Sequence, residues 1–491
     1  MKVILHIGTE KTGTSSIQHF LHLNRNRLPK NGFHLMRAAG EYDQRAIAAY
    51  TRADNEVDYY FQEHGINSTE AREAFRTDLE LKIDKELNSL PTNVHTVIIS
   101  SEHFHSTVRT DRAMKKLQTL LKKYFQNFKV ICYLREQGAM CTSWYSTALK
   151  SGLCRTLEAF TEKQCRPQNY YFNYEQLLSR WAGSFGQGSV DLAIYDKSEF
   201  LEGDLLKDFT YRIDPTLLGQ LKPYEQQANQ SLSPEGQRLL LGVNCAFPRT
   251  QGGAESIRVL CREEIYNLLK GRGRQLDLPT RKSIYESFLE SNTKVQETYF
   301  PNRKALFPVP DTDVPIDEEF SKNGRRALDR VLQVVRDNGS SLLGSQYVKE
   351  AQQLIEDIYL GHAGIPFDWG NVSLFGKGLI KANRHGVMHA SLVIRNTSTE
   401  PLEFSEKPSC HYSIGWRLMD KAGNQLDKLC GNVQVEKVIP PGTFRLVSVA
   451  FRPDIGSDNI EKACFIEFSF IERGKWLNEE HPLNSAWALL V

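Results

Sequence analysis

Short, unbroken apolar runs in about the first 200 residues alternate with longer stretches that show helical spacing. The runs are rich in Val, Ile and Leu, which is typical of strands buried on both faces, and they cover Lys2–Ile7, His95–Ser100, Lys129–Leu134 and Val190–Tyr195. Helical spacing begins at Thr14 and recurs at 69–87, 114–124 and 135–152. Strands that alternate with helices predict an α/β domain with a parallel sheet.

Beyond these elements the chain shows one long polar segment and a series of helical patterns. The polar segment, 29–59, contains Gly32 and Gly40 as breakers, and we expect it to be irregular and to line an acceptor cleft. The helical patterns lie at 200–209, 235–245, 257–269, 281–292, 325–335 and 347–359. Asp337–Ser341 separates the last two, which predicts a helical hairpin.

From about Asp368 onward the hydrophobic period changes to two. Short runs bounded by turn residues predict an all-β sandwich, and they lie at 388–394, 412–419, 431–438, 445–451, 464–471 and 486–491. The pattern resembles β-sandwich modules of bacterial polysaccharide-handling proteins, some of which bind glycans. The tryptophans of this region are candidate sugar platforms or buried core residues, and they are Trp369, Trp416, Trp476 and Trp487.

A Pro- and Asp-rich segment at 309–319 marks a boundary between domains. We expect an α/β domain at 1–310, a linker with the helical hairpin at 311–362, and the β-sandwich at 363–491 as a possible glycan-binding module. Two or three domains also agree with the chain length of 491 residues.

Composition narrows the class of protein. The net charge of +2 gives no basic field that would favour nucleic acid. Nine cysteines are scattered without a C-x-x-C pair, which disfavours a zinc ribbon and suits free thiols in a reducing compartment. No apolar run reaches the ~18 residues of a membrane span, and no signal peptide precedes Gly8. We therefore expect a cytoplasmic protein without a transmembrane segment, whose oligomeric state stays open.

The loop GTEKTGTSS, between the first strand and the first helix, carries the chemistry on which the interpretation depends. A strand, a Gly-bounded loop and a helix N-terminus aim backbone N–H groups at one point, which suits a phosphate or sulfate. Gly8 and Gly13 have the spacing of a Walker A motif, but Thr14 occupies the place of its lysine, and Lys11 lies inside the loop. The strand at 97–100 leads into Ser-Glu, not into the Asp of a Walker B motif. A metal-dependent nucleotide triphosphatase is therefore disfavoured, and we expect no metal.

This loop resembles the 5′-phosphosulfate loop of the sulfotransferases that use 3′-phosphoadenosine 5′-phosphosulfate (PAPS). The fold that the resemblance implies is a P-loop-like, three-layer α/β domain. The resemblance also implies that Lys11 contacts the 5′-phosphate and the bridging oxygen. The residues that would surround the 5′-phosphate are Thr12, Gly13, Thr14, Ser15 and Ser16. The alternative interpretation is a Gly/Thr-rich turn that caps an ordinary helix.

A second match to the family follows the third strand. The family's 3′-phosphate motif is a strand, an Arg and, eight residues later, a Ser on the next helix, and Arg135 and Ser143 have this spacing. Arg offers a planar fork of donors to a phosphate, although an ordinary surface ion pair is the alternative. In other members a basic loop late in the domain adds a 3′-phosphate contact, for which Arg303 or Lys304 is a candidate and a solvated turn the alternative.

Transfer of a sulfuryl group to a hydroxyl needs a base within about 3 Å of the acceptor proton. Glu102 ends the second predicted strand and is the first candidate, since several carbohydrate sulfotransferases use a carboxylate there. His103 is the second candidate, because imidazole is the better base near neutral pH, and His105 is the third. The alternative is that Glu102 caps a turn and that the histidines are surface residues.

Taken together, the resemblance implies a PAPS-dependent sulfotransferase, bacterial and similar to carbohydrate sulfotransferases. The acceptor would be a hydroxyl or amine of a glycan, such as a cell-surface or exported polysaccharide, or of a small molecule; lipids and proteins stay open. One alternative is a P-loop nucleotide kinase, which would require Mg²⁺ and ATP. Another is a glycan-binding protein without catalysis.

Overall fold

The computed structural model describes residues 1–54, 56, 58–224, 231–247, 254–312, 321–343 and 345–360, and beyond them the strands whose bounds are given below. The chain divides into two compact units. The first consists of Met1–Tyr145, Phe160–Gln230 and Gln275–Ile316, and the second of Ser146–Ala159, Ser231–Arg274 and Asp317–Val491.

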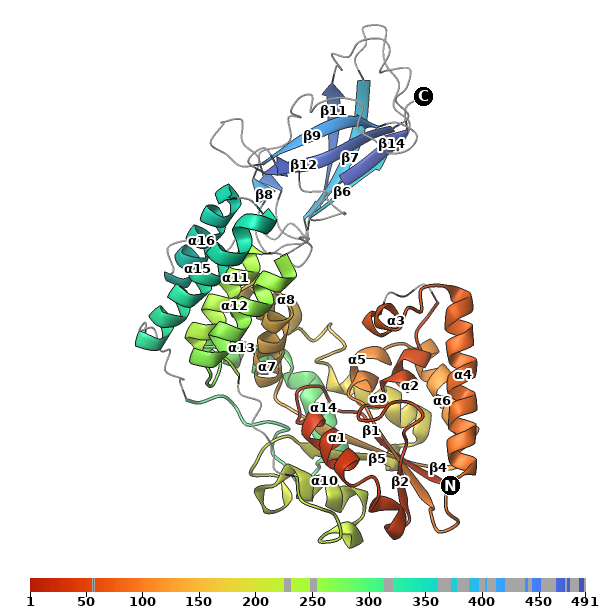
Figure 1. Cartoon of the computed structure of the whole chain (residues 1–491). Coiled ribbons are helices and arrows are strands. Elements are labelled where there is room, and N and C mark those ends of the chain that lie inside the picture. The colour runs from red at the N-terminus through yellow and green to blue at the C-terminus, as the bar shows by residue number, and fades with distance from the viewer. Residues whose placement is uncertain are drawn as a thin grey trace. The chain divides into compact units, whose positions relative to one another are not determined.

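A five-stranded sheet forms the framework of the first unit (Figure 1). In spatial order its strands are β2 (Phe33–Leu35), β3 (Thr96–Ser100), β1 (Lys2–His6), β4 (Asn127–Leu134) and β5 (Val190–Ile194). Every neighbouring pair is parallel, so the predicted α/β domain with a parallel sheet is confirmed. Because the strands run in one direction, the residues that follow β3, β1 and β4 meet at the same edge of the sheet.

Helices cover both faces of this sheet. Five consecutive residues of β4, Val130 to Leu134, are fully buried, which requires packing on both sides of the strand. On one side, Ile131 and Tyr133 share a core cluster with residues of α1 (Thr14–Leu23) and α10 (Leu205–Ile213). In addition, α9 (Tyr174–Phe185) packs against β4 and β5, and α6 (Asp111–Lys122) packs against α9.

Further helices of the first unit lie between these strands or follow the last of them. They are α2 (Arg45–Tyr50), α3 (Tyr59–Glu63), α4 (Thr69–Asn88), α5 (His103–Thr107), α13 (Leu278–Ser287) and α14 (Leu289–Tyr299). The single helix predicted at 281–292 is wrong, because Phe288 leaves helical geometry and divides the stretch into α13 and α14. Two further helices, α7 (Gln137–Lys150) and α8 (Leu157–Gln164), run from one unit into the other.

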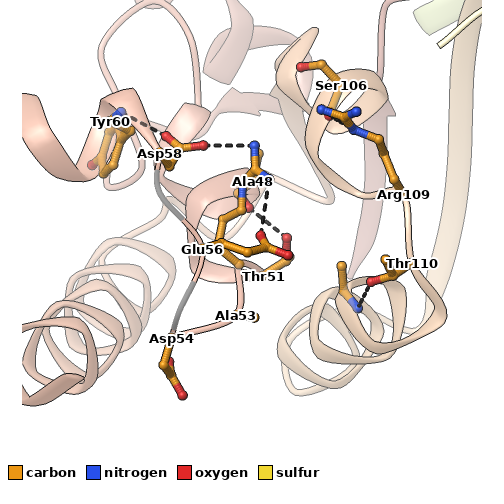
Figure 2. A network of polar contacts seen from close by, with 12 residues as sticks. Ala48, Thr51, Ala53, Asp54, Glu56, Asp58, Tyr60, Ser106, Arg109 and Thr110 are labelled. Atoms are coloured by element: carbon orange, nitrogen blue, oxygen red, sulfur yellow. Dashed lines mark hydrogen bonds and ion pairs between the residues drawn. The ribbon is translucent and has the colours of Figure 1, made fainter. Parts of the chain in front are cut away.

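The segment 29–59 is not irregular, and this prediction is wrong. It contributes β2, an edge strand with Phe33 and Leu35 buried, and α2. Hydrogen bonds stabilise the end of α2 and the start of α3 (Figure 2). The Thr51 hydroxyl donates to the Ala48 carbonyl at 2.7 Å, and the Asp58 carboxylate accepts from the Tyr60 N–H at 2.8 Å. β2 has three residues and α2 has six, which is too few for either element to show a hydrophobic period in the sequence.

The second unit contains a group of helices: α11 (Pro234–Ala246), α12 (Ala254–Leu268), α15 (Lys322–Leu343) and α16 (Ser345–Leu360). α15 packs against α16, as the predicted hairpin requires. However, α15 continues through Asp337–Ser341, so that the turn between the two helices lies later than the sequence suggested. Within the described residues, none of the helices is both long and apolar enough to span a membrane.

In the C-terminal part of the second unit the described residues form antiparallel strands. They are β6 (Val372–Lys377), β7 (Met388–Asn396), β8 (Leu402–Glu403), β9 (Tyr412–Met419), β10 (Val438–Ile439), β11 (Phe444–Phe451), β12 (Phe465–Glu472), β13 (Lys475–Trp476) and β14 (Ser485–Leu489). The pairs are β6–β7, β7–β11, β8–β10, β9–β12, β12–β13 and β12–β14. The sandwich itself and the domain boundaries at 310 and 362 stay predictions. Trp369 and most of the run at 431–438 lie outside the described residues.

Candidate functional site

The loop that follows β1 depends on two glycines with left-handed backbone geometry. Gly8 has a φ of +99° and Gly13, which caps α1, has a φ of +74°. A Cβ at Gly8 would lie 2.9 Å from the Glu10 nitrogen, and a Cβ at Gly13 would collide with the Leu205 side chain. Both positions therefore require glycine, and the predicted order of strand, Gly-bounded loop and helix is present.

Hydrogen bonds fix this loop to the neighbouring strand β4. The Tyr133 N–H donates to the Gly8 carbonyl at 2.7 Å, and the Thr9 N–H donates to the Tyr133 carbonyl at 3.0 Å. Within the loop, the Thr12 hydroxyl donates to the Thr9 carbonyl at 2.6 Å. The loop is thus a rigid extension of the sheet. A rigid turn that ends at a helix N-terminus is chemically suited to an anion.

Arg135, at the end of β4, reaches this loop. Its Nη1 donates a hydrogen bond to the carbonyl of Lys11 at 2.9 Å, and its guanidinium lies 5.5 Å from the centre of the Tyr195 ring. Lys11 itself has a φ of +66°. Burial lowers the pKa of Arg135, which shows that water solvates this cation poorly. Two of the residues singled out in the sequence, 124 positions apart, are therefore in direct contact.

Ser143 lies on α7, which begins directly after Arg135. The Glu136 carboxylate holds the first turn of this helix, since it accepts hydrogen bonds from the N–H groups of Gly138 and Ala139 at 2.8 and 2.7 Å. Six residues separate Gln137 from Ser143, which is about 9 Å along a helix axis. Ser143 is half-buried. The structure thus places it on the helix that the sequence predicted.

A cavity of about 760 Å³ opens at the carboxyl ends of β4 and β5. Its walls include Arg135, Tyr195 and Phe200, together with Arg303 and Lys304. A carboxylate at the same cavity, that of Glu199, accepts two hydrogen bonds from Nη1 of Arg303, both at 2.9 Å. The cavity therefore combines basic, acidic and aromatic side chains.

Glu102 follows β3 and faces the same loop. Its Oε2 accepts a hydrogen bond from Nε2 of Gln18, on α1, at 2.5 Å. A Cβ at Gly8 would lie 3.5 Å from the Glu102 Cβ, so Glu102 stands beside the loop that Arg135 reaches from the other side. A carboxylate in this position can accept a proton from a group bound next to the loop.

Asp43 is a member of this site that the sequence did not reveal. Its Oδ2 lies 3.4 Å from Nε2 of His103. Burial, and next the charge of Glu102, raise the pKa of Asp43 to about 7, whereas burial lowers the pKa of His103. The ligand atoms of these three side chains lie within 4.8 Å of one another, so they could also hold a metal ion, although exposed acidic groups are common without one.

The segment that carries Asp43 is anchored to β3 by its neighbour, Gln44. The Gln44 N–H donates to the Ser100 carbonyl at 3.1 Å, and the Ser100 N–H donates to Oε1 of Gln44 at 2.8 Å. Gln44 thus pairs with the end of β3 much as a strand residue would. This explains how a residue from the segment 29–59 comes to lie beside Glu102.

His105 is not available as a base, and its place as third candidate is wrong. It is fully buried; its Nδ1 accepts from the Glu10 N–H at 3.3 Å and its Nε2 donates to the Tyr171 carbonyl at 2.9 Å. Burial lowers its pKa to about 4. The Tyr171 hydroxyl donates to Oε2 of Glu10 at 2.7 Å. His105 and Tyr171 therefore both bond to Glu10 and help to hold the loop in place.

Comparison with known proteins adds little to this geometry. No protein-family model matches the chain. An uncharacterized protein of Archaeoglobus fulgidus is 26% identical over 213 residues, which make up 42% of this chain and 55% of that protein's length. A sulfotransferase from Alicyclobacillus acidocaldarius covers 49% of this chain and 89% of its own, with a TM-score of 0.28 and 11% identity. The DNA glycosylase AlkC of Pseudomonas fluorescens covers 97% of this chain and 99% of its own, with a TM-score of 0.17 and 10% identity. TM-scores this low carry no argument about fold or function.

Proposed function

We propose that the chain is a sulfotransferase that moves a sulfuryl group from PAPS to a hydroxyl or amine of an acceptor. One observation carries this proposal: the hydrogen bond of 2.9 Å between the Arg135 guanidinium and the Lys11 carbonyl. It joins the anion-type loop after β1 to the arginine after β4, at the edge of a parallel sheet where ligands gather. The 5′ and 3′ phosphates of one nucleotide would then be held by the loop and by the arginine that contacts its backbone.

We assign the residues around the donor the following binding roles. Lys11 and the loop residues from Thr12 to Ser16 would hold the 5′-phosphosulfate, and the lysine would meet the charge that builds on the bridging oxygen. Arg135 and Ser143 would hold the 3′-phosphate. Two features of the cavity beside Arg135 support this assignment. Tyr195 and Phe200 offer aromatic walls, and Arg303 and Lys304 offer positive charge, which the carboxylates of Glu136, Asp196 and Glu199 partly offset.

On the acceptor side, Glu102 would act as the base. The acceptor oxygen forms a bond to sulfur, the bond from sulfur to the bridging oxygen breaks, and the acceptor proton moves to the Glu102 carboxylate. The hydrogen bond from Gln18 fixes the direction in which that carboxylate points. His103 is the second candidate for the base, and Asp43, 3.4 Å from it, would orient its ring. Adenosine 3′,5′-bisphosphate leaves, and the step needs no metal.

A glycan is the acceptor class that we propose, with the region 363–491 as a glycan-binding module. This part of the proposal rests on the sequence pattern of that region and on the hydroxyl chemistry of the reaction. Adding hydroxyl-bearing small molecules to the panel of the transfer assay below would separate these acceptors from glycans.

A second candidate function, a metal-dependent nucleotide kinase, is favoured by one feature. The ligand atoms of Asp43, Glu102 and His103 lie within 4.8 Å of one another, and a divalent ion there would stand at the end of β3 beside the loop. Against it, Thr14 occupies the place of the Walker A lysine.

Two measurements on the full chain separate these functions. Calorimetry should detect binding of adenosine 3′,5′-bisphosphate without added metal and unchanged by EDTA, and weaker binding of ATP with Mg²⁺. Transfer of radiolabelled sulfate from PAPS to a panel of glycans should then give labelled product. Tight, EDTA-sensitive binding of ATP with Mg²⁺ and no binding of the bisphosphate would contradict the sulfotransferase proposal and support the kinase. Glycan binding with neither nucleotide bound would leave only the non-catalytic alternative.

A further inference from the structure

The hydroxyl of Tyr174, the first residue of α9, reaches the turn between β4 and α7. Tyr174 is fully buried, and its hydroxyl donates a hydrogen bond to the carbonyl of Arg135. The same oxygen lies 3.2 Å from Sδ of Met140, in the first turn of α7. Burial raises the pKa of Tyr174, so the hydroxyl keeps its proton at neutral pH and remains a donor.

The carbonyl of Arg135 lies between two backbone ladders and depends on a side chain for its donor. The Leu134 carbonyl accepts from the N–H of the residue that follows β5, at 2.7 Å, and the Glu136 carbonyl accepts from the Met140 N–H at 2.9 Å, where the ladder of α7 begins. Between them, Tyr174 supplies the donor for Arg135. Without its hydroxyl this carbonyl would face a buried apolar ring, which costs free energy.

The path of the backbone at Arg135 decides where its guanidinium lies. Nη1 of Arg135 donates to the Lys11 carbonyl at 2.9 Å, and the guanidinium lies 5.5 Å from the centre of the Tyr195 ring. Both contacts require that the start of this side chain keeps its position relative to the sheet. Because α9 packs against β4 and β5, the hydroxyl of Tyr174 is itself held by the sheet, and it fixes the Arg135 carbonyl relative to it.

The ring of Tyr174 makes a separate contact with the wall of the cavity beside Arg135. Its centre lies 6.2 Å from that of the Phe307 ring, with 60° between the planes. Phe307 and Arg135 both line that cavity. A phenylalanine at position 174 would keep the ring and its packing, whereas only the hydroxyl reaches Arg135. Removal of one oxygen atom therefore separates the two contributions of Tyr174.

We propose that Tyr174 is a positioning residue for recognition of the 3′-phosphate of the donor, and that it acts through the carbonyl of Arg135. The inference deepens the proposed function and rests on it for the identity of the donor. Charge-assisted hydrogen bonds from a guanidinium to a phosphate depend on its orientation, so a shift of the Arg135 backbone weakens them. The loop that would hold the 5′-phosphate is bonded to Tyr133 of β4 and keeps its conformation.

Calorimetry on the full chain compares adenosine 3′,5′-bisphosphate with adenosine 5′-monophosphate, which lacks the 3′-phosphate. The parent chain should bind the bisphosphate more tightly. Tyr174→Phe should lower the affinity for the bisphosphate at least fivefold and that for the monophosphate at most twofold. In an Arg135→Ala background it should have no further effect on either. Tyr170→Phe is the matched control, because the Tyr170 hydroxyl also donates to a carbonyl, that of Val108 at 3.3 Å. Met140→Leu removes the sulfur contact alone and should retain the affinity.

Four results would overturn Tyr174 as a positioning residue. They are an unchanged affinity of Tyr174→Phe for the bisphosphate, an equal fall for both nucleotides, a fall that persists in the Arg135→Ala background, and a matching fall in Met140→Leu. A Tyr174→Phe chain that does not fold would assign the hydroxyl a structural role only, and so also contradicts the proposal. A parent chain that binds both nucleotides equally well would instead contradict the proposed function, and with it any role of Tyr174 in 3′-phosphate recognition.

Discussion

The side-chain amide of Gln18 donates a 2.5 Å hydrogen bond to Oε2 of Glu102. Gln18 lies on the helix that follows the glycine loop, and Glu102 follows a different strand, so the bond ties the two sides of the site together. An amide donor occupies one oxygen of the carboxylate and leaves the other for a further partner. The arrangement is the one that a base beside a bound donor would need.

Glu102→Gln should abolish sulfate transfer and leave binding of the bisphosphate unchanged, because the amide has nearly the same shape but cannot take a proton. Initial rates with PAPS and the best acceptor, together with calorimetry, measure the two effects. We expect a loss of at least about 100-fold, the lower end for removal of a general base. A normal rate would move the role of base to His103.

Arg135→Ala should weaken binding of adenosine 3′,5′-bisphosphate by about 1.5–3 kcal/mol, the usual value of hydrogen bonds to charged groups. The change also removes the bond to the Lys11 carbonyl, so part of the loss comes from a less ordered loop. Arg180→Ala is the matched control, because Arg180 pairs with Asp111 at the surface, 3.1 Å away. Equal affinity of parent and Arg135→Ala in calorimetry would remove Arg135 from the site.

Lys11→Ala should remove turnover while the protein stays folded. The contact with Arg135 uses the backbone carbonyl of Lys11, which alanine retains, so the substitution deletes the ammonium alone. Transfer rates with PAPS should fall much further than the affinity for the bisphosphate, since the lysine acts mainly on charge that develops in the transition state. Retained turnover with an unchanged melting temperature would exclude the role in leaving-group stabilisation.

Asp43→Asn should make the protein more stable relative to the parent at pH 8 than at pH 5. The pKa of Asp43 is raised from 3.8 to about 7 by burial and by Glu102, so the folded state holds a proton that the unfolded chain releases. Between these values the folded state binds more protons, and the carboxyl lowers the free energy of unfolding as pH rises. Because asparagine cannot titrate, the free energy of unfolding of the variant lacks this decrease with rising pH.

Urea denaturation at the two pH values measures this difference. Glu63→Gln, at an exposed glutamate, is the control and should show the same difference from the parent at both pH values. An Asp43→Asn protein whose stability differs from the parent equally at pH 5 and pH 8 would contradict the raised pKa.

The sequence predicted the strands whose burial is continuous and failed where elements are short. β1, β3 and β4 each contain an unbroken apolar run and Asp191 alone interrupts that of β5, whereas β2 has only three residues and no visible period. The contact between Lys11 and Arg135 follows from the parallel sheet, because both residues come directly after neighbouring strands. No sequence pattern predicts that Asp43 lies at the site. Its neighbour Gln44 holds it there by bonding to Ser100, 56 positions away.

His105 illustrates a different limit of sequence reasoning. Like Glu102 and His103, it follows β3 directly. The sequence alone does not tell whether its ring faces a ligand or the protein core. The hydrogen bonds to Glu10 and Tyr171 decide that question, and they depend on chain segments 66 and 95 positions away. Local pattern therefore identified the neighbourhood of the site, and long-range packing assigned the individual roles.

The double hydrogen bond between Gln44 and Ser100 has a consequence for how acceptors would enter. Because this segment is bonded to the end of an interior strand of the sheet, we expect this wall of the site to keep its conformation when an acceptor binds. Selection among acceptors would then depend on complementarity to a ready-made surface. Amide hydrogens of Gln44 and Ser100 should accordingly exchange with deuterium as slowly as those in the middle of β3.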